Sequence, residues 1–266
     1  MSALAALAAF LGVGVVTGLS AGLFGIGGGL LIVPALSWLL PRLGVAPEVS
    51  VHLAIGTSLG SIVLTAVSAV LAHHRHGAVR WDLFRRMLPG LVAGALAGAW
   101  LADQLPGDGL RRLFGGFELL IGAWLLASPR VHAGAQAAGR WLLGLGGGVI
   151  GLVSALLGIG GGTLTVPLLL WRGVPAQQAV ATASACGLPL ALFGALGFVL
   201  AGWGDALLPP GASGYLYWPA LGGIVIASMT AAPLGARLAH ALPGARLKRL
   251  FGLVVVGLGA GMLSHA

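Results

Sequence analysis

The chain has 266 residues, of which 58% are hydrophobic and only 8% are charged, and its net charge is +8. Because a soluble domain carries about 25% charged residues, this composition excludes a soluble protein and predicts a chain that lies almost wholly in a membrane. The basic residues lie in short loops between apolar segments, which excludes the clustered face that nucleic acid requires. A single cysteine, Cys186, excludes an internal disulfide and a cysteine-based zinc site. We expect no metal and no organic cofactor.

Ten apolar segments are predicted to be helices of an all-α, polytopic membrane bundle. They lie at residues 3–24, 28–40, 50–72, 87–102, 112–127, 141–157, 162–171, 179–203, 215–239 and 249–264. The first has no basic region before it and continues into a glycine-rich stretch, which indicates a first helix and not a cleaved signal peptide. Most segments can span ~30 Å of hydrocarbon. The second and seventh cannot, because about 13 residues at 1.5 Å each reach only ~20 Å.

A glycine motif precedes both short segments. The first copy is Gly25–Gly29 and the second is Gly158–Gly162, and each is followed by Val-Pro. The copies are half a chain length apart, so the chain is predicted to contain two repeats of one membrane domain, at residues 1–133 and 134–266. Each repeat should contain a long helix, the glycine break, a short helix and three further helices.

The direction of the chain at each glycine break decides the topology. If a break reverses the chain, a repeat makes five passes and the second repeat is inverted relative to the first. Eleven basic residues then lie on one side and three, Arg42, Arg111 and Arg112, lie on the other; a mere kink would divide them six against eight. The positive-inside rule therefore favours inverted repeats, with both termini and loop 204–214 outside and loop 73–86 in the cytoplasm.

The glycine motifs are the first candidate binding site. A break in hydrocarbon is tolerated where it lines a cavity or packs on protein. Glycine lets a ligand approach the main chain, and the N–H groups that open a helix bind anions. The residues predicted to line a substrate site are Gly25, Gly27, Gly28, Gly29, Gly158, Gly160, Gly161 and Gly162. The alternative is that these glycines only permit close packing of helices.

Hydroxyl side chains on the helix after each short segment form the second candidate. Residues 54–60 and 181–187 align as matched stretches, which pairs Thr57 with Ser184. The hydroxyls predicted to donate to an oxyanion or to coordinate a cation are those of Thr57, Ser58, Thr182 and Ser184. Alternatively, they bond back to their own backbone, as Ser and Thr in membrane helices commonly do.

The paired G-x-G-G-G-x(4)-P segments, each followed by an A-x-x-[TS]-[SA] helix, resemble the sulfite exporter TauE/SafE family of bacterial membrane transporters. The resemblance covers nearly the whole chain. It implies a transporter of the bacterial inner membrane, in a family associated with export of sulfite and related sulfur-containing anions. The inverted duplication with broken helices favours a secondary transporter, so we expect export of a small sulfur-containing anion, sulfite or an organosulfonate, by alternating access. The implied partners are the small anion and the lipid bilayer, and a homo-oligomer remains open.

Few ionisable side chains are candidates for chemistry. Glu118 lies in the middle of an apolar segment, where a carboxylate is a functional hypothesis by default and could couple transport to protons. The alternative is a neutral acid bonded to a neighbouring helix. His73, His74 and His76 indicate a solvated helix end, with a metal cluster or pH sensor as the alternative. No catalytic set is visible, so a membrane enzyme is disfavoured and a passive anion channel is the main competing function.

Overall fold

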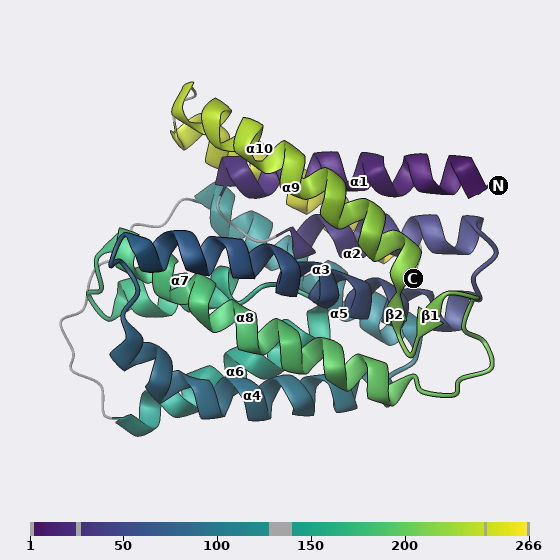
Figure 1. Cartoon of the computed structure of the whole chain (residues 1–266), viewed down its shortest axis with the longest axis horizontal. Helices are drawn as coiled ribbons and strands as arrows, with labels where there is room; N and C mark the ends of the chain where they lie inside the picture. The colour runs from purple at the N-terminus through teal and green to yellow at the C-terminus, as the bar shows by residue number, and fades with distance from the viewer. Residues whose placement is uncertain (1–2, 25–27, 128–139, 242–243, 265–266) are drawn as a thin grey trace.

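The computed structural model describes residues 3–24, 28–127, 140–241 and 244–264. This part of the chain contains ten α-helices and one two-stranded hairpin (Figure 1). The elements are α1 (Ala3–Phe24), α2 (Gly29–Arg42), α3 (Pro47–Arg75), α4 (Trp81–Asp103), α5 (Gly107–Ala127), α6 (Arg140–Leu157), α7 (Gly162–Trp171), α8 (Ala176–Ala201), β1 (Ala212–Ser213), β2 (Leu216–Tyr217), α9 (Trp218–Ala241) and α10 (Gly244–Ser264). The all-α prediction is confirmed, with helix ends displaced by a few residues.

Four of the described helices are both long and apolar enough to cross a membrane. They are Leu4–Leu23, Pro47–Arg75, Ala176–Ala201 and Trp218–Gly235. We expected more segments to qualify. Helices α4 and α5 have 23 and 21 residues, which is sufficient length, but charged residues occupy their first turns. The short helices α2 and α7, with 14 and 10 residues, remain too short, as predicted.

Both short helices end in the same glycine turn. Gly44 after α2 and Gly173 after α7 have φ of +87° and +75°, the left-handed conformation that ends many helices. Each turn bonds backward to the last turn of its helix: the amide of Val45 donates to Leu40 O and the amide of Val174 donates to Leu169 O. The same local chemistry therefore ends both short helices and starts the long helix that follows.

The bundle has two distinct ends. The hairpin end holds β1 and β2, the start of α3 and the end of α4, because His52 stacks on Tyr215 and bonds to the carbonyls of Ala102 and Leu105. The opposite end, which we call the arginine end, holds the turn between α3 and α4 with Arg75 and Arg80. Helix α1 starts at the hairpin end and α2 returns to it, so the two helices run in opposite directions (Figure 1).

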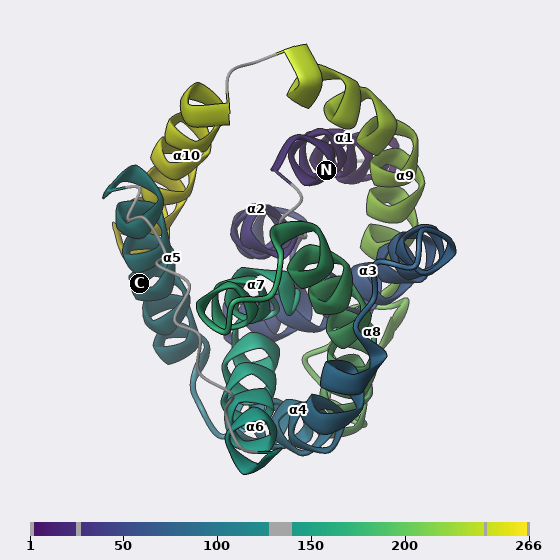
Figure 2. The ribbon, with the colours of Figure 1, turned by 90° about the vertical axis from the view of Figure 1, so that its left-hand side faces the viewer.

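The helices pack in pairs that cross between the halves of the chain. Helix α1 packs on α9, α6 packs on α4, and α5 packs on α10. Figure 2, which looks along the bundle, shows these three pairs around α2, α3, α7 and α8. Glycines allow close approach of the backbones: a Cβ on Gly14 of α1 would lie 2.6 Å from Ile224 O of α9. Such contacts through small residues are typical of membrane bundles.

The hairpin is the one element that the sequence did not predict. Residues 215–217 were expected to begin a helix but form β2 and its turn, because Gly211 and Gly214 adopt φ of +88° and +54°. Burial raises the pKa of Tyr215 to about 12. Its hydroxyl therefore keeps its proton and donates to Asp205 Oδ2 at 3.3 Å. The amide of Tyr215 also donates to Phe198 O, which fixes the hairpin over the end of α8.

Candidate functional site: a central cavity at the two glycine breaks

A cavity of about 730 Å³ lies at the centre of the bundle, between α1, α2, α3, α8 and α9. Gly28 and Gly160–Gly162 border it, and so does His73, near the end of α3 that lies at the arginine end. Its polar lining consists of Thr17, Ser61, Thr65, Ser68, His73, Ser184 and Ser228. The cavity therefore extends from the middle of the bundle toward the arginine end.

The predicted glycines divide into two groups. Gly28, at the start of α2, lines the cavity together with Gly160, Gly161 and Gly162 before and at the start of α7. Gly29 and Gly158 are not part of the lining, and Gly25 and Gly27 lie outside the described residues. The start of each short helix thus borders the same space.

Gly29 and Gly158 form a crossing point between the two halves of the chain. A Cβ on Gly29 would lie 2.5 Å from Gly158 O and 3.3 Å from Ser58 Oγ. Gly158 has φ of +66°, and a Cβ there would lie 3.0 Å from the Cα of Ile55. Ser58 Oγ donates to Gly158 O at 2.7 Å, so the predicted ligand Ser58 instead joins α3 to the second break. This packing joins α2, α3 and the second glycine break beside the cavity.

Thr57 and Thr182 also have structural partners outside the cavity. The hydroxyl of Thr57 accepts a hydrogen bond from the backbone N–H of Tyr217 at 3.0 Å. The hydroxyl of Thr182 accepts one from the backbone N–H of Arg80, also at 3.0 Å. Tyr217 and Arg80 each immediately precede a helix, α9 and α4. Thr57 therefore corresponds to Thr182, and the predicted pairing of Thr57 with Ser184 is wrong, because it followed sequence alignment without knowledge of these bonds.

Hydroxyl groups in the lining donate to carbonyls of their own helices. Ser184 donates to Val180 O at 3.0 Å, Ser61 to Ser58 O at 2.7 Å and Ser228 to Val225 O at 3.1 Å. Ser184 thus bonds back to the backbone of its own helix, which is the alternative given above for these side chains. A hydroxyl can rotate, so each can exchange this bond for one to a bound oxyanion.

The electrostatics of the cavity come from the backbone. Among the residues that the structure describes, the lining contains no Asp, Glu, Lys or Arg. Neither α2 nor α7 has an acidic residue in its first turn. The unpaired N–H groups at a helix start carry about half a positive charge. Two such starts at one cavity, with no carboxylate to offset them, favour an anion.

Glu118 lies away from this cavity, at the interface of α5 and α10. Its side chain is fully buried, and its Cβ contacts the position that a Cβ on Gly259 would occupy, at 2.9 Å. Within the described part of the chain neither carboxyl oxygen has a hydrogen-bond partner, so the neutral acid bonded to a neighbouring helix is not observed. Among the described residues, no three side chains of His, Cys, Asp or Glu lie close enough together to hold a metal ion. His73, His74 and His76 therefore do not form such a group in this structure.

Several lining residues were not identified from the sequence. Ser61, Thr65 and Ser68 follow Ser58 along α3 at intervals of three or four residues. Such spacing places side chains on one helix face, and a hydroxyl stripe on an apolar helix could have indicated a polar cavity. Thr17 and Ser228 do not belong to a stripe of this length, and only the pairing of α1 with α9 brings them together.

The fold and the cavity define the class of protein. A multi-pass helical bundle with two broken helices whose starts border one cavity is an arrangement typical of secondary transporters. The family model described as sulfite exporter TauE/SafE matches residues 10–262. The chain belongs to this family, as the paired glycine motifs indicated.

Relatives support the same class. A probable membrane transporter protein of Haemophilus influenzae is 34% identical over 248 residues, which cover 92% of this chain and 93% of the relative. Proteins with the same description from Methanocaldococcus jannaschii and Xylella fastidiosa are each 28% identical, over 84% and 93% of this chain and 80% and 91% of their own lengths. No solved structure matches the chain.

Proposed function

We propose that this protein is a secondary transporter that exports a small sulfur-containing anion, sulfite or an organosulfonate, by alternating access across the bacterial inner membrane. The observation that carries the proposal is the position of Gly28 and Gly160–Gly162, which bring the starts of α2 and α7 to one cavity without a carboxylate in its described lining. Backbone N–H groups bind oxyanions such as sulfite and sulfonates without requiring a charged side chain.

The two halves are inverted repeats in this proposal. Two observations support the relation: α1 pairs with α9 as α6 pairs with α4, and the hydroxyls of Thr57 and Thr182 accept equivalent backbone bonds. If the two halves exchanged their conformations, the cavity would then open alternately to each end of the bundle. We favour a transporter over a passive channel because the broken helices of both halves meet at one cavity, an arrangement typical of secondary transporters.

The membrane orientation follows from charge. The arginine end includes Arg75, Arg80, Arg85 and Arg86 and is assigned to the cytoplasm by the positive-inside rule. Both termini and the hairpin then lie outside, and in this proposal His73 lines the cavity on its cytoplasmic side. An inside-negative potential favours export of an anion by about 2.3 kcal/mol per charge per 100 mV, so export requires no coupled ion.

Gly162→Val tests the binding site. A Cβ at Gly162 would meet nothing within 4 Å, so valine adds bulk to the cavity without disturbing the packing. The matched control is Gly116→Val on α5, which also has open space but lies on an exposed face. We expect Gly162→Val to abolish sulfite efflux from vesicles and the stabilisation by sulfite in detergent, which follows RT ln(1 + [L]/Kd). Equal efflux by the two variants would rule out this site.

Gly187→Ala provides a finer test of the backbone N–H groups. A Cβ at Gly187 would lie 3.6 Å from the amide nitrogen of Gly161, close enough to cover it without a clash. We expect weaker sulfite binding with unchanged thermal stability of the ligand-free protein.

A further inference from the structure

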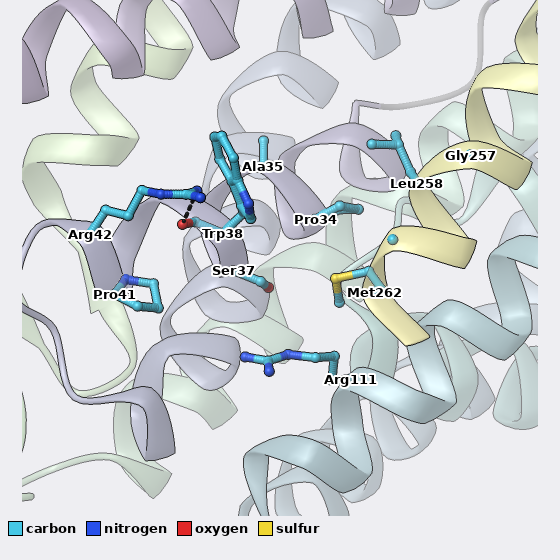
Figure 3. A pocket seen from close by; sticks show the side chains of 11 residues that line it. Pro34, Ala35, Ser37, Trp38, Pro41, Arg42, Arg111, Gly257, Leu258 and Met262 are labelled. Atoms are coloured by element: carbon cyan, nitrogen blue, oxygen red, sulfur yellow. Dashed lines mark hydrogen bonds between the residues drawn. The ribbon is translucent and has the colours of Figure 1, made fainter. Parts of the chain in front are cut away.

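A second cavity, of about 520 Å³, lies between α2 and α10 and is bordered by α5. We call it the α2–α10 groove (Figure 3). Its lining on α2 includes Pro34, Ala35, Trp38 and Arg42, whereas Gly28 and Ile32 of α2 line the central cavity instead. The C-terminal half of α2 thus borders a space of its own near the hairpin end, which the proposed transport mechanism does not use.

Two arginines supply the positive charge of the groove. The guanidinium of Arg42 lies over the ring of Trp38, 3.2 Å from its centroid, and Nη1 donates to Trp38 O at 3.1 Å. Arg111 extends from α5 toward α2, as Figure 3 shows, and its side chain is only 14% exposed. Its carboxylate partner Asp108 lies 3.7 Å away and is 71% exposed, so water screens that pair.

The rest of the groove is apolar. Leu258 and Met262 of α10 face Pro34 of α2 (Figure 3), and Gly257 and Gly261 leave open space beside them. The hydroxyl of Ser37 donates to Val33 O at 2.7 Å, so it presents acceptors and not its proton. Donors for an anion therefore come from Arg42 and Arg111, next to a surface suited to hydrocarbon.

The position of the groove fits an amphiphile at the membrane surface. Trp38 is 58% exposed near the end of α2, and tryptophan is enriched at the level of lipid headgroups. Arg42 and Arg111 lie at the end of α2 and the start of α5, one end of the bundle. Both arginine side chains border the groove at this level, where a phosphate would lie while acyl chains extend along α10.

We propose that the α2–α10 groove binds an anionic phospholipid, with its phosphate on Arg42 and Arg111. Arginine binds phosphate through paired N–H donors, more strongly than neutral donors do. A small exported anion fits this groove less well, because such an anion has no use for the apolar surface of α10. Complementary charge at one end and apolar surface along the remainder are what a diacyl phospholipid presents.

The test is lipid-dependent stability of the full-length protein, purified and delipidated in detergent. Phosphatidylglycerol should raise the melting temperature more than phosphatidylcholine does. Arg42→Gln and Arg111→Gln should each weaken phosphatidylglycerol binding by about tenfold or more, because each removes a charge-assisted hydrogen bond. Arg112→Gln, on the exposed face of α5, is the matched control and should bind like the wild type.

Two further variants separate the site from general folding. Arg42→Lys with Arg111→Lys keeps the charge and should retain most of the effect of phosphatidylglycerol. Gly261→Val fills the open space beside α10 and should abolish that effect without changing any charge. An equal response of Arg112→Gln and the Arg42 and Arg111 variants overturns the proposal. Displacement of phosphatidylglycerol by millimolar sulfite would also overturn it, because the groove would then hold the exported anion.

Discussion

The two glycine breaks have nearly the same sequence, but their equivalent residues have different neighbours. Gly29 opens α2 and Gly162 opens α7, each at the last position of its motif. A Cβ on Gly29 would meet the backbone of Gly158 at 2.5 Å, whereas a Cβ on Gly162 would meet nothing within 4 Å. At this last position of the motif, Gly29 is therefore packed and Gly162 faces the cavity.

The helices that follow show the same difference. Since Thr57 corresponds to Thr182, Ser58 of α3 corresponds to Ala183 of α8. Ser58 bonds to Gly158 O at the crossing point, while Ala183 lines the cavity. If the two repeats exchange environments during transport, the difference between Gly29 and Gly162 belongs to the state, because both residues are glycine. The difference between Ser58 and Ala183 also lies in the sequence, because alanine has no hydroxyl to donate.

The largest effect is expected from alanine at the packed glycine. Gly29→Ala inserts a methyl group against the Gly158 carbonyl and disturbs the bond of that carbonyl to Ser58. We therefore expect the free energy of unfolding to fall by about 3 kcal/mol. Gly162→Ala adds a methyl group in open space and replaces a residue of low helix propensity, so stability should stay equal or rise by up to about 1 kcal/mol. Thermal unfolding in detergent measures both. Similar losses from the two variants would contradict the difference in packing.

The threonine pair tests the correspondence between the halves. Thr57→Val and Thr182→Val keep the side-chain shape but leave the amide of Tyr217 or Arg80 without its acceptor. We expect the free energy of unfolding to fall by about 2 kcal/mol for Thr57→Val and by about 1 kcal/mol for Thr182→Val. The second loss is smaller because Arg80 is exposed, so water can replace its bond to Thr182. Thr57→Ser and Thr182→Ser keep the hydroxyl and are the controls. Valine variants as stable as the serine variants would show that these bonds do not support the fold.

The sequence predicted the parts of this fold that depend on local chemistry. Apolar segments gave the helices, and the glycine motifs gave the two breaks that reach the cavity. Ligand assignments were less reliable, because a hydroxyl on an apolar helix can face a cavity or a neighbouring backbone. Ser58 and Thr57 bond to residues 100 and 160 positions away in the chain, and local patterns contain no information on such partners. The hairpin was missed although Gly211 precedes its first strand and Gly214 lies in its turn.

The smallest effect is expected at Glu118, where the halves differ in chemistry but not in burial. Its counterpart by repeat alignment is Val255 on α10, and both side chains are fully buried. Glu118 is not in the lining of either cavity described above, so a proton on it has no evident route to the substrate. We therefore favour uncoupled export driven by the membrane potential.

Glu118→Gln keeps the shape of the side chain and its hydrogen-bonding capacity but removes titration. We expect sulfite efflux from vesicles to stay close to the wild-type rate and its pH dependence to change little. The measurement compares efflux over a pH series with and without a protonophore. Gly116→Val, on the exposed face of the same helix, is the control for effects of a substitution in α5 that do not involve Glu118. If Glu118→Gln abolishes proton-driven transport while sulfite still stabilises the protein, then Glu118 carries the proton and the buried difference between the halves is the coupling element.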